Sequence, residues 1–138
     1  GDAMRPAVVQ RMADPGVEIL LAGHQHASFG GVVTCGLGGP TTGANPDRPV
    51  RILPLTDRDA GRLLEASAVA PLFDDDAHRA VVEVALLRLA AALEHIPELA
   101  DIELNPVMVA ERAEVATARV RVAPYVWDEG PAVRRLGG

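Results

Sequence analysis

The stretch from residue 76 to 94 constrains the fold of this chain more than any other, because it is long and mostly apolar. We expect a helix that opens at Asp74, Asp75 and Asp76 and runs to about His95. Three acidic side chains suit the positive end of a helix dipole, and we favour this interpretation over a metal cluster. A helix that is apolar over most of its circumference must be covered on more than one side. It is therefore either central to this domain or docked onto something outside it. Its apolar interior positions are Val81, Val82, Val84, Leu86, Leu87, Leu89 and Leu93.

The composition narrows the class of protein. The chain has 138 residues and is 49% hydrophobic but only 3% aromatic, so a core must be built from Leu, Val, Ile and Ala. A formal net charge of −6 argues against a surface for nucleic acid or anionic membrane. No apolar run approaches the ~20 residues that span a bilayer, and no signal-peptide pattern is present. Cys35 is the only cysteine, which excludes an intrachain disulfide and favours a cytoplasmic protein.

Turn-forming residues divide the rest of the chain into strands, loops and a second helix. Residues 24–28 are polar enough for a hairpin connection, and residues 36–49 are rich in Gly, Pro and Thr, as loops are. Thr56 is expected to cap a helix with Asp59 at its N3 position, and that helix runs to about Ala68. The expected strands in this part are residues 8–12, 17–23, 30–35 and 50–54.

Residues 102–109 and 114–122 form the last pair of expected strands. The connection of four residues between them implies an antiparallel hairpin that brings Asn105 close to Thr117 or Ala118. We therefore predict an α/β domain with a mixed, largely antiparallel sheet and packed helices over residues 1–123. Residues 124–138 have no periodicity and are expected to form an extended tail.

Glu103 and Asn105 stand two residues apart in the first of these strands, and Pro106 follows them. Alternation along a strand puts their side chains on one face. A carboxylate and an amide oxygen are ligands for a hard cation such as Mg²⁺. The residues by themselves are equally compatible with a capped strand end, so both interpretations stay open here.

Three other features have a functional and a structural interpretation. His24 and His26 have a spacing that could clamp a transition metal, but no further Cys or His lies nearby, which favours an exposed connection. Cys35 would need a neighbouring base to act as a nucleophile, and we expect a small buried residue. The glycines of the GLGG motif could cradle a phosphate with backbone N–H groups or could simply form a turn. These glycines are Gly36, Gly38 and Gly39.

Several stretches, taken in order, resemble one known family. The resemblance is to the ATP-grasp domain of NDP-forming acyl-CoA synthetases, and in particular to the acetyltransferase-fused, protein-acyltransferase-like variant. It covers residues 8–124 and corresponds to the C-terminal lobe of the ATP-grasp fold. The stretches that carry it are VVQRMADPGVEILLAG, SFGGVVTCGLGG, RILPLTDRDA, APLF, ELADIELNPVMV and ATARVRVAP. The preceding lobe, with its nucleotide-holding lysine, is expected to lie upstream of Gly1.

The resemblance implies ATP and Mg²⁺ as cofactors, since the family phosphorylates an acyl or histidine intermediate. Asn105 matches the family's metal-binding asparagine, with Glu103 beside it. Glu18 matches a glutamate of the nucleotide-site strand. The segment that borders the adenine corresponds to Gln10 and Met12 at its ends. The glycines Gly36, Gly38 and Gly39 of GLGG complete the implied nucleotide site.

The chain departs from the family pattern at polar positions. Thr117 stands where the family's final strand has a metal-binding aspartate, and a neutral hydroxyl is a poor ligand for Mg²⁺. Gly43 replaces a common acidic residue after GLGG. His26 and Ala27 replace an Asp-Pro pair. The stretch 73–76 replaces a Gly-Tyr-Arg-Gly loop. Apolar framework segments are kept while polar ones are lost, which suggests that the metal site is degenerate.

Two functions follow from this comparison. The first is a nucleotide-handling lobe of an NDP-forming acyl-CoA synthetase-like or protein acetyltransferase-like protein. The second is a non-catalytic structural or regulatory module that docks onto CoA-binding or acetyltransferase domains. In either case we expect the isolated chain to be inactive and to bind nucleotide weakly. The apolar helix should leave an exposed patch, so we also expect self-association.

Overall fold

The strands of this chain join into one antiparallel sheet in the computed structural model, which describes residues 16–44 and 48–124. The expected strand at residues 8–12 and the tail from residue 125 onward lie outside the described residues. In chain order the elements are β1 (Val17–His26), β2 (Gly30–Leu37), η2 (Gly39–Ala44), β3 (Val50–Ile52), α1 (Asp57–Ala66), η3 (Ala70–Leu72), α2 (Asp76–His95), β4 (Leu99–Val109), β5 (Ala113–Val115) and β6 (Ala118–Val122).

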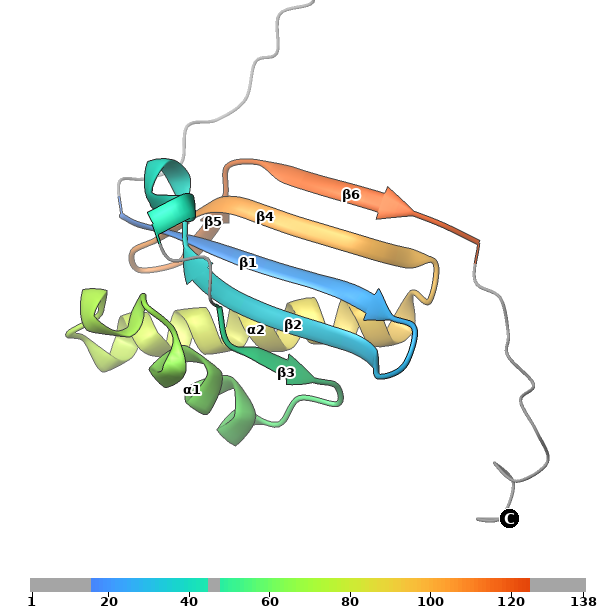
Figure 1. Ribbon diagram of the computed structural model, residues 1–138. Coiled ribbons are helices and arrows are strands. Elements are labelled where there is room, and N and C mark those ends of the chain that lie inside the picture. The colour runs from blue at the N-terminus through green and yellow to red at the C-terminus, as the bar shows by residue number, and fades with distance from the viewer. Residues whose placement is uncertain (1–15, 45–47, 125–138) are drawn as a thin grey trace, which may run out of the picture.

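The sheet has the strand order β3-β2-β1-β4-β5, and β6 also pairs with β4 (Figure 1). Every pairing among the described strands is antiparallel. This arrangement confirms the predicted fold class. The two long strands β1 and β4 lie side by side in the middle, so that residues far apart in the sequence meet there.

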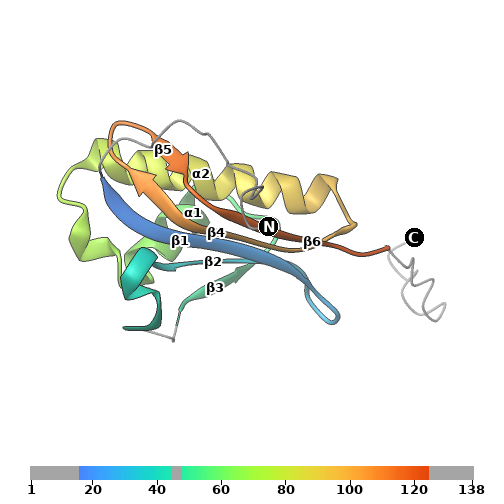
Figure 2. The ribbon, with the colours of Figure 1, turned by 90° about the horizontal axis from the view of Figure 1, so that it is seen from above.

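Both helices pack on the same face of the sheet (Figure 1). α2 contacts β1, β2 and β4 and runs lengthwise along the strands, whereas α1 contacts β2 and β3 (Figure 2). On β1, Ile19 and Leu21 point into the core beneath the helices. Glu18 and Leu20 therefore point to the opposite face, because side chains alternate along a strand. η2 contacts β1 and β2 at the end of the sheet where β1 begins.

The N-termini of both helices are capped as the sequence predicts. The Thr56 side chain accepts a hydrogen bond from the Asp59 N–H, and the Asp59 carboxylate accepts one from the Thr56 N–H. This is a complete capping box. Asp75 is the N-cap of α2 and accepts a hydrogen bond from the Ala77 N–H at 2.7 Å. The helix-capping interpretation of the acidic run is thus confirmed for Asp75.

Several predicted boundaries were wrong. Strand β1 continues through His24 and His26, because both pair with β2, and β2 itself continues to Leu37. The predicted loop at 36–49 contains the 3₁₀ helix η2. The helix α1 ends at Ala66, one residue before its C-cap Ser67.

The last predicted strand was also wrong, since it is divided into β5 and β6. The cause is Pro106, which has no N–H to donate and so interrupts the ladder of β4. Around it the Asn105 N–H donates to the Thr117 carbonyl at 3.0 Å, and the Ala116 N–H donates to the Pro106 carbonyl at 3.0 Å. β5 then pairs with residues 107–109 and β6 with residues 99–104.

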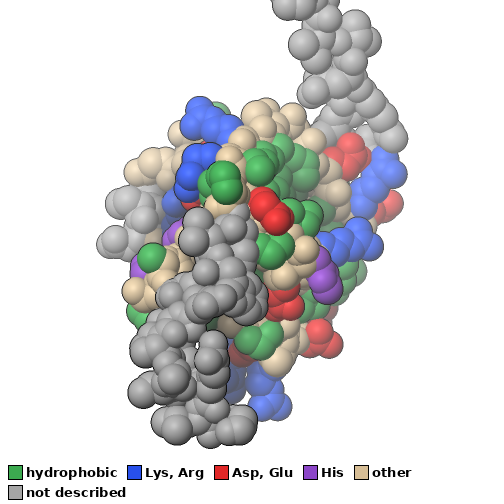
Figure 3. Space-filling model, turned by 90° about the vertical axis from the view of Figure 1, so that its right-hand side faces the viewer, with side chains coloured by type: hydrophobic (Ala, Val, Ile, Leu, Met, Phe, Trp, Pro, Cys, Tyr) green, Lys and Arg blue, Asp and Glu red, His purple; other side chains and the backbone are tan. Residues whose placement is uncertain are grey.

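The surface carries charged side chains of both signs, as the composition of the sequence predicts. On the end of the molecule shown in Figure 3, acidic, basic and hydrophobic side chains are intermixed. None of the helices in the described part is long and apolar enough to span a membrane.

Candidate functional site

Asn105 joins the glycine-rich segment to the middle of the sheet. Its side-chain oxygen accepts a hydrogen bond from the Gly39 N–H at 2.8 Å. Its side-chain nitrogen donates to the Thr42 hydroxyl oxygen at 2.9 Å, and that hydroxyl donates to the Gly39 carbonyl at 2.8 Å. Together with the bond from the Asn105 N–H to Thr117, these contacts confirm that Asn105 lies close to Thr117. The amide of Asn105 therefore holds η2 in place.

The GLGG glycines fit a tight packing requirement. A Cβ on Gly38 would lie 2.4 Å from the backbone of Ile19, and one on Gly36 would lie 2.4 Å from the side chain of Arg48. Gly39 has a φ of 59°, which L side chains rarely adopt. The Gly38 N–H donates to the Glu18 carbonyl at 3.3 Å, and the Gly39 N–H is bonded to Asn105. A phosphate at these two amides would have to displace protein acceptors.

Glu18 lies against the same glycine segment. A Cβ built on Gly39 would stand 2.2 Å from the Glu18 carboxylate oxygen Oε2. The fold thus brings Glu18, Gly39 and Asn105 together, although they come from β1, η2 and β4. Gln10 and Met12, the other expected nucleotide contacts, lie outside the described residues.

Glu103 lies on the sheet face that points away from the helices. Its neighbours Ile102 and Leu104 pack toward α2, so Glu103 and Asn105 share the opposite face. Across β6, Glu103 is directly opposite Arg119. The structure thereby places the two expected metal ligands on one face. Metal binding by Glu103 and Asn105 stays a prediction.

The described residues offer few further ligands for Mg²⁺. Thr117 is exposed and contributes its carbonyl to the bond from Asn105. Gly43 has no side chain, so its position supplies no carboxylate. Within residues 16–44 and 48–124, no group of three His, Cys, Asp or Glu side chains could hold a metal ion. One carboxylate and an amide oxygen that already accepts a hydrogen bond fit Mg²⁺ only weakly.

The remaining candidates have structural explanations. Cys35 is fully buried in the core, and burial raises the pKa of its thiol to about 11. It is the small buried residue that we expected. The His26 Nδ1 accepts a hydrogen bond from the Ser28 N–H at 3.0 Å, and its ring lies 4.7 Å from the ring of Phe29.

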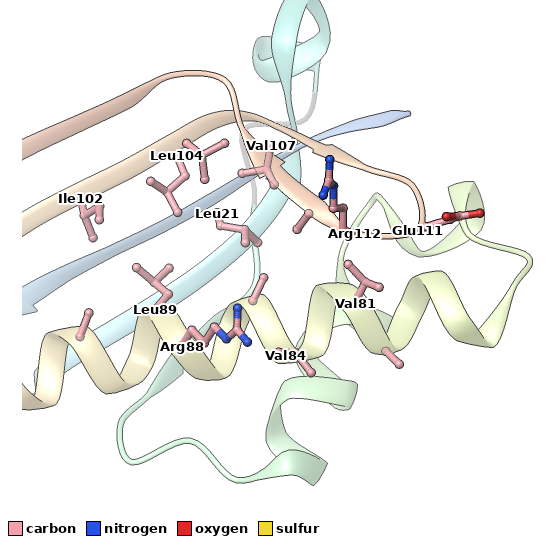
Figure 4. Close-up of a pocket in the computed structure, with 15 residues that line it drawn as sticks. Leu21, Val81, Val84, Arg88, Leu89, Ile102, Leu104, Val107, Glu111 and Arg112 are labelled. Carbon is pink, nitrogen blue, oxygen red and sulfur yellow. The ribbon is translucent and has the colours of Figure 1, made fainter. Parts of the chain in front are cut away.

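A feature that sequence reasoning found only in part is an apolar groove between α2 and the sheet. Its volume is about 710 Å³, and Figure 4 shows side chains of α2 and of β4 facing each other across it. The apolar pattern of α2 predicted one wall. The other wall, formed by β4 and β5, required knowledge of which strands lie over the helix. Its apolar lining includes Leu21, Val81, Val84, Leu89, Ile102, Leu104, Val107 and Val115.

Comparison with known protein families identifies a match over most of the chain. Residues 2–123 match the family described as the ATP-grasp domain. The chain is 33% identical over 120 residues to acetate–CoA ligase [ADP-forming] II of Archaeoglobus fulgidus, and the match covers 83% of this chain and 18% of that protein. It is 24% identical over 115 residues to the β subunit of acetate–CoA ligase [ADP-forming] II of Pyrococcus furiosus, which covers 79% and 49%. The chain thus spans less than half the length of either relative.

Solved structures show the same fold. One is the dinucleotide-forming acetyl-coenzyme A synthetase 1 of Ca. Korarchaeum cryptofilum in complex with coenzyme A and Mg-AMPPCP. It superposes with a TM-score of 0.72 at 28% identity, over 80% of this chain and 55% of that chain. Its apo form superposes with a TM-score of 0.73 at 27% identity, over 82% and 57%.

Proposed function

The chain belongs to the ATP-grasp domain family and is related to the ADP-forming acetyl-CoA synthetases, and from this premise we propose that it is a nucleotide-handling lobe with a weakened metal site. The observation that carries the proposal is the junction of Glu18, Gly39 and Asn105, where the glycine segment is tied to the face of β4 that bears Glu103. A synthetase with the same fold binds Mg-AMPPCP, which supports a phosphate-directed role for this face.

The metal ligands in this proposal are Glu103 and Asn105. When bound beside phosphates, Mg²⁺ neutralises the charge on their oxygens. The Glu103 carboxylate would supply the anionic ligand, and the second lone pair of the Asn105 side-chain oxygen would supply a neutral one. Because Thr117 adds no carboxylate, we expect the chain to bind nucleotide with millimolar affinity at best. This corresponds to a binding free energy on the order of 4 kcal/mol.

Nucleotide contacts would come from Glu18 and the glycines Gly36, Gly38 and Gly39, with Gln10 and Met12 near the base. The amides of Gly38 and Gly39 are already bonded within the protein. Their role in this proposal is therefore to shape the segment that faces the phosphates. The isolated chain should show no ATP hydrolysis, since one weak cation site cannot neutralise a transferring phosphoryl group by itself.

The test is a calorimetric titration of three proteins with Mg²⁺ and with Mg-ATP: the unmodified chain, Thr117→Asp and Thr117→Val. Thr117 is exposed and contributes its backbone carbonyl, so both substitutions should leave the fold intact. The aspartate should raise Mg²⁺ affinity about tenfold through a charge-assisted bond. The valine should change it little. Tight Mg-ATP binding by the unmodified chain, or no gain from the aspartate, would contradict the proposal.

The apolar groove favours a second candidate, a non-catalytic module that docks onto other domains of a longer protein, such as CoA-binding or acetyltransferase domains. The relatives are longer than this chain, and their other parts could cover the groove. The same titration separates the two functions. If Thr117→Asp and the unmodified chain both fail to bind Mg-ATP while remaining folded, the docking module is favoured.

A further inference from the structure

Two acidic residues of β4 each lie opposite an arginine of β6, but only one of these two pairs forms an ion pair. Asp101 lies opposite Arg121, and Glu103 lies opposite Arg119. The Arg121 side chain donates to the Asp101 carboxylate and forms an ion pair with it. Among the described residues, neither Arg119 nor Glu103 has a side-chain hydrogen bond or an ion pair, although directly opposite side chains can reach each other.

Glu103 and Arg119, the pair without an ion pair, lie next to the proposed phosphate face. Glu103 precedes Asn105 by two positions on β4, so both side chains and that of Arg119 point to the same side of the sheet. A shallow hollow of about 630 Å³ borders this place. The other charged or titratable side chains that line it are His24, Asp101 and Arg121. Because Arg121 is held by Asp101, Arg119 is the guanidinium that is available to a ligand there.

We propose that Arg119 binds a polyphosphate oxygen directly and so replaces part of the charge neutralisation that the weakened metal site lacks. The proposal rests on the proposed function, because it assumes that phosphates approach this face. A planar guanidinium can bind two phosphate oxygens at once and is always charged. Glu103 beside it provides only one negative charge for a cation, and Thr117 adds none. Phosphate binding at Arg119 should therefore need little Mg²⁺.

The same geometry predicts opposite effects on anions and on metal ions. Removing the charge of Arg119 takes away a partner for phosphate but also removes repulsion against a cation at Glu103. Arg119→Gln should weaken polyphosphate binding and leave Mg²⁺ binding equal or stronger. A residue that served only to stabilise the strand would show neither effect.

The experiment titrates the chain with inorganic tripolyphosphate in EDTA at low ionic strength, and separately with Mg²⁺ alone. The variants are Arg119→Gln, Arg119→Lys and Arg121→Gln. The last is a matched control, since it removes the same charge from the same strand but at a position whose arginine is already paired. We expect Arg119→Gln to weaken tripolyphosphate binding about fivefold, Arg119→Lys to be intermediate, and Arg121→Gln to change it less than about twofold.

Two outcomes would overturn the inference. One is tripolyphosphate binding that is absent from the unmodified chain or unaffected by Arg119→Gln. The other is an equal loss in Arg121→Gln, which would indicate a general effect of net charge. All variants should unfold at similar urea concentrations, because both positions are exposed. A failure of the proposed function can be told apart from a failure of this inference. Titration with adenine nucleotide and the Thr117→Asp variant tests the proposed function. Titration with tripolyphosphate and Mg²⁺ tests the role of Arg119.

Discussion

Gly39 in the glycine segment is held in place by side chains from two strands. Asn105 and Glu18 hold Gly39 from two sides, one through a hydrogen bond and one through side-chain packing. Burying the Gly39 N–H without its acceptor would cost about 1–3 kcal/mol. Asn105 thus has a structural role in this chain.

Gly39→Ala should lower the free energy of unfolding by about 1–2 kcal/mol, because alanine is strained at the observed φ of 59° and its Cβ would collide with Glu18. The measurement is urea unfolding. Gly43→Ala is the matched control, since its Cβ meets nothing within 4 Å and its φ is not positive. Equal stability of the two variants would contradict the packing that we describe.

Among the elements, α1 shows how a local pattern can determine an end of a helix. Thr56 and Asp59 satisfy each other's backbone N–H groups, as the sequence predicts. The hydrogen bond from the Thr56 backbone, followed by the one from its side chain, lowers the pKa of the Asp59 carboxyl below its model-compound value of 3.8. The charged form of Asp59 is therefore favoured in the folded state.

Asp59→Asn should reduce the dependence of stability on acid pH. A carboxyl whose pKa is lower in the folded than in the unfolded state stabilises the fold above the unfolded pKa. That stabilisation is lost as the pH falls through the folded pKa. Urea unfolding between neutral pH and about pH 3 should therefore show a shallower decline for the variant than for the unmodified chain. Parallel declines would show that the capping box does not persist in solution.

At the scale of the whole molecule, the groove between α2 and the sheet leaves apolar side chains exposed to solvent. The exposed fractions of Val84 and Val115, which both line it, are 46% and 49%. Exposed apolar side chains at the groove are the reason for which we expect an interaction there. The prediction that α2 would need cover on more than one side agrees with this groove, while self-association itself stays a prediction.

Val84→Arg should decrease self-association of the isolated chain, because it places a charge at the wall of the groove. Sedimentation velocity over a range of concentrations measures the effect. Ala91→Arg is the matched control, since Ala91 is exposed on the same helix but does not line the groove. If the unmodified chain sediments as a strict monomer at high concentration, the groove does not bind a second copy.

The sequence by itself determined the features that depend on near neighbours in the chain. The capping box of α1, the cap of α2 and the antiparallel pairing next to Asn105 follow from residue types within a few positions of one another. The fold class followed as well, because alternation and turn residues specify strands, and the family motifs occur in order. The candidate residues Glu103 and Asn105 were visible for the same reason.

Only the tertiary structure decided which distant groups meet. The bond from Asn105 to Gly39 spans 66 positions, and no local pattern predicts it. The pairing of β1 with β4 brings Glu18 opposite Met108, 90 positions further along the chain. The sheet wall of the groove likewise depends on strand order. Such contacts arise from packing in three dimensions, where sequence separation has no direct meaning, and the candidate site is built from them.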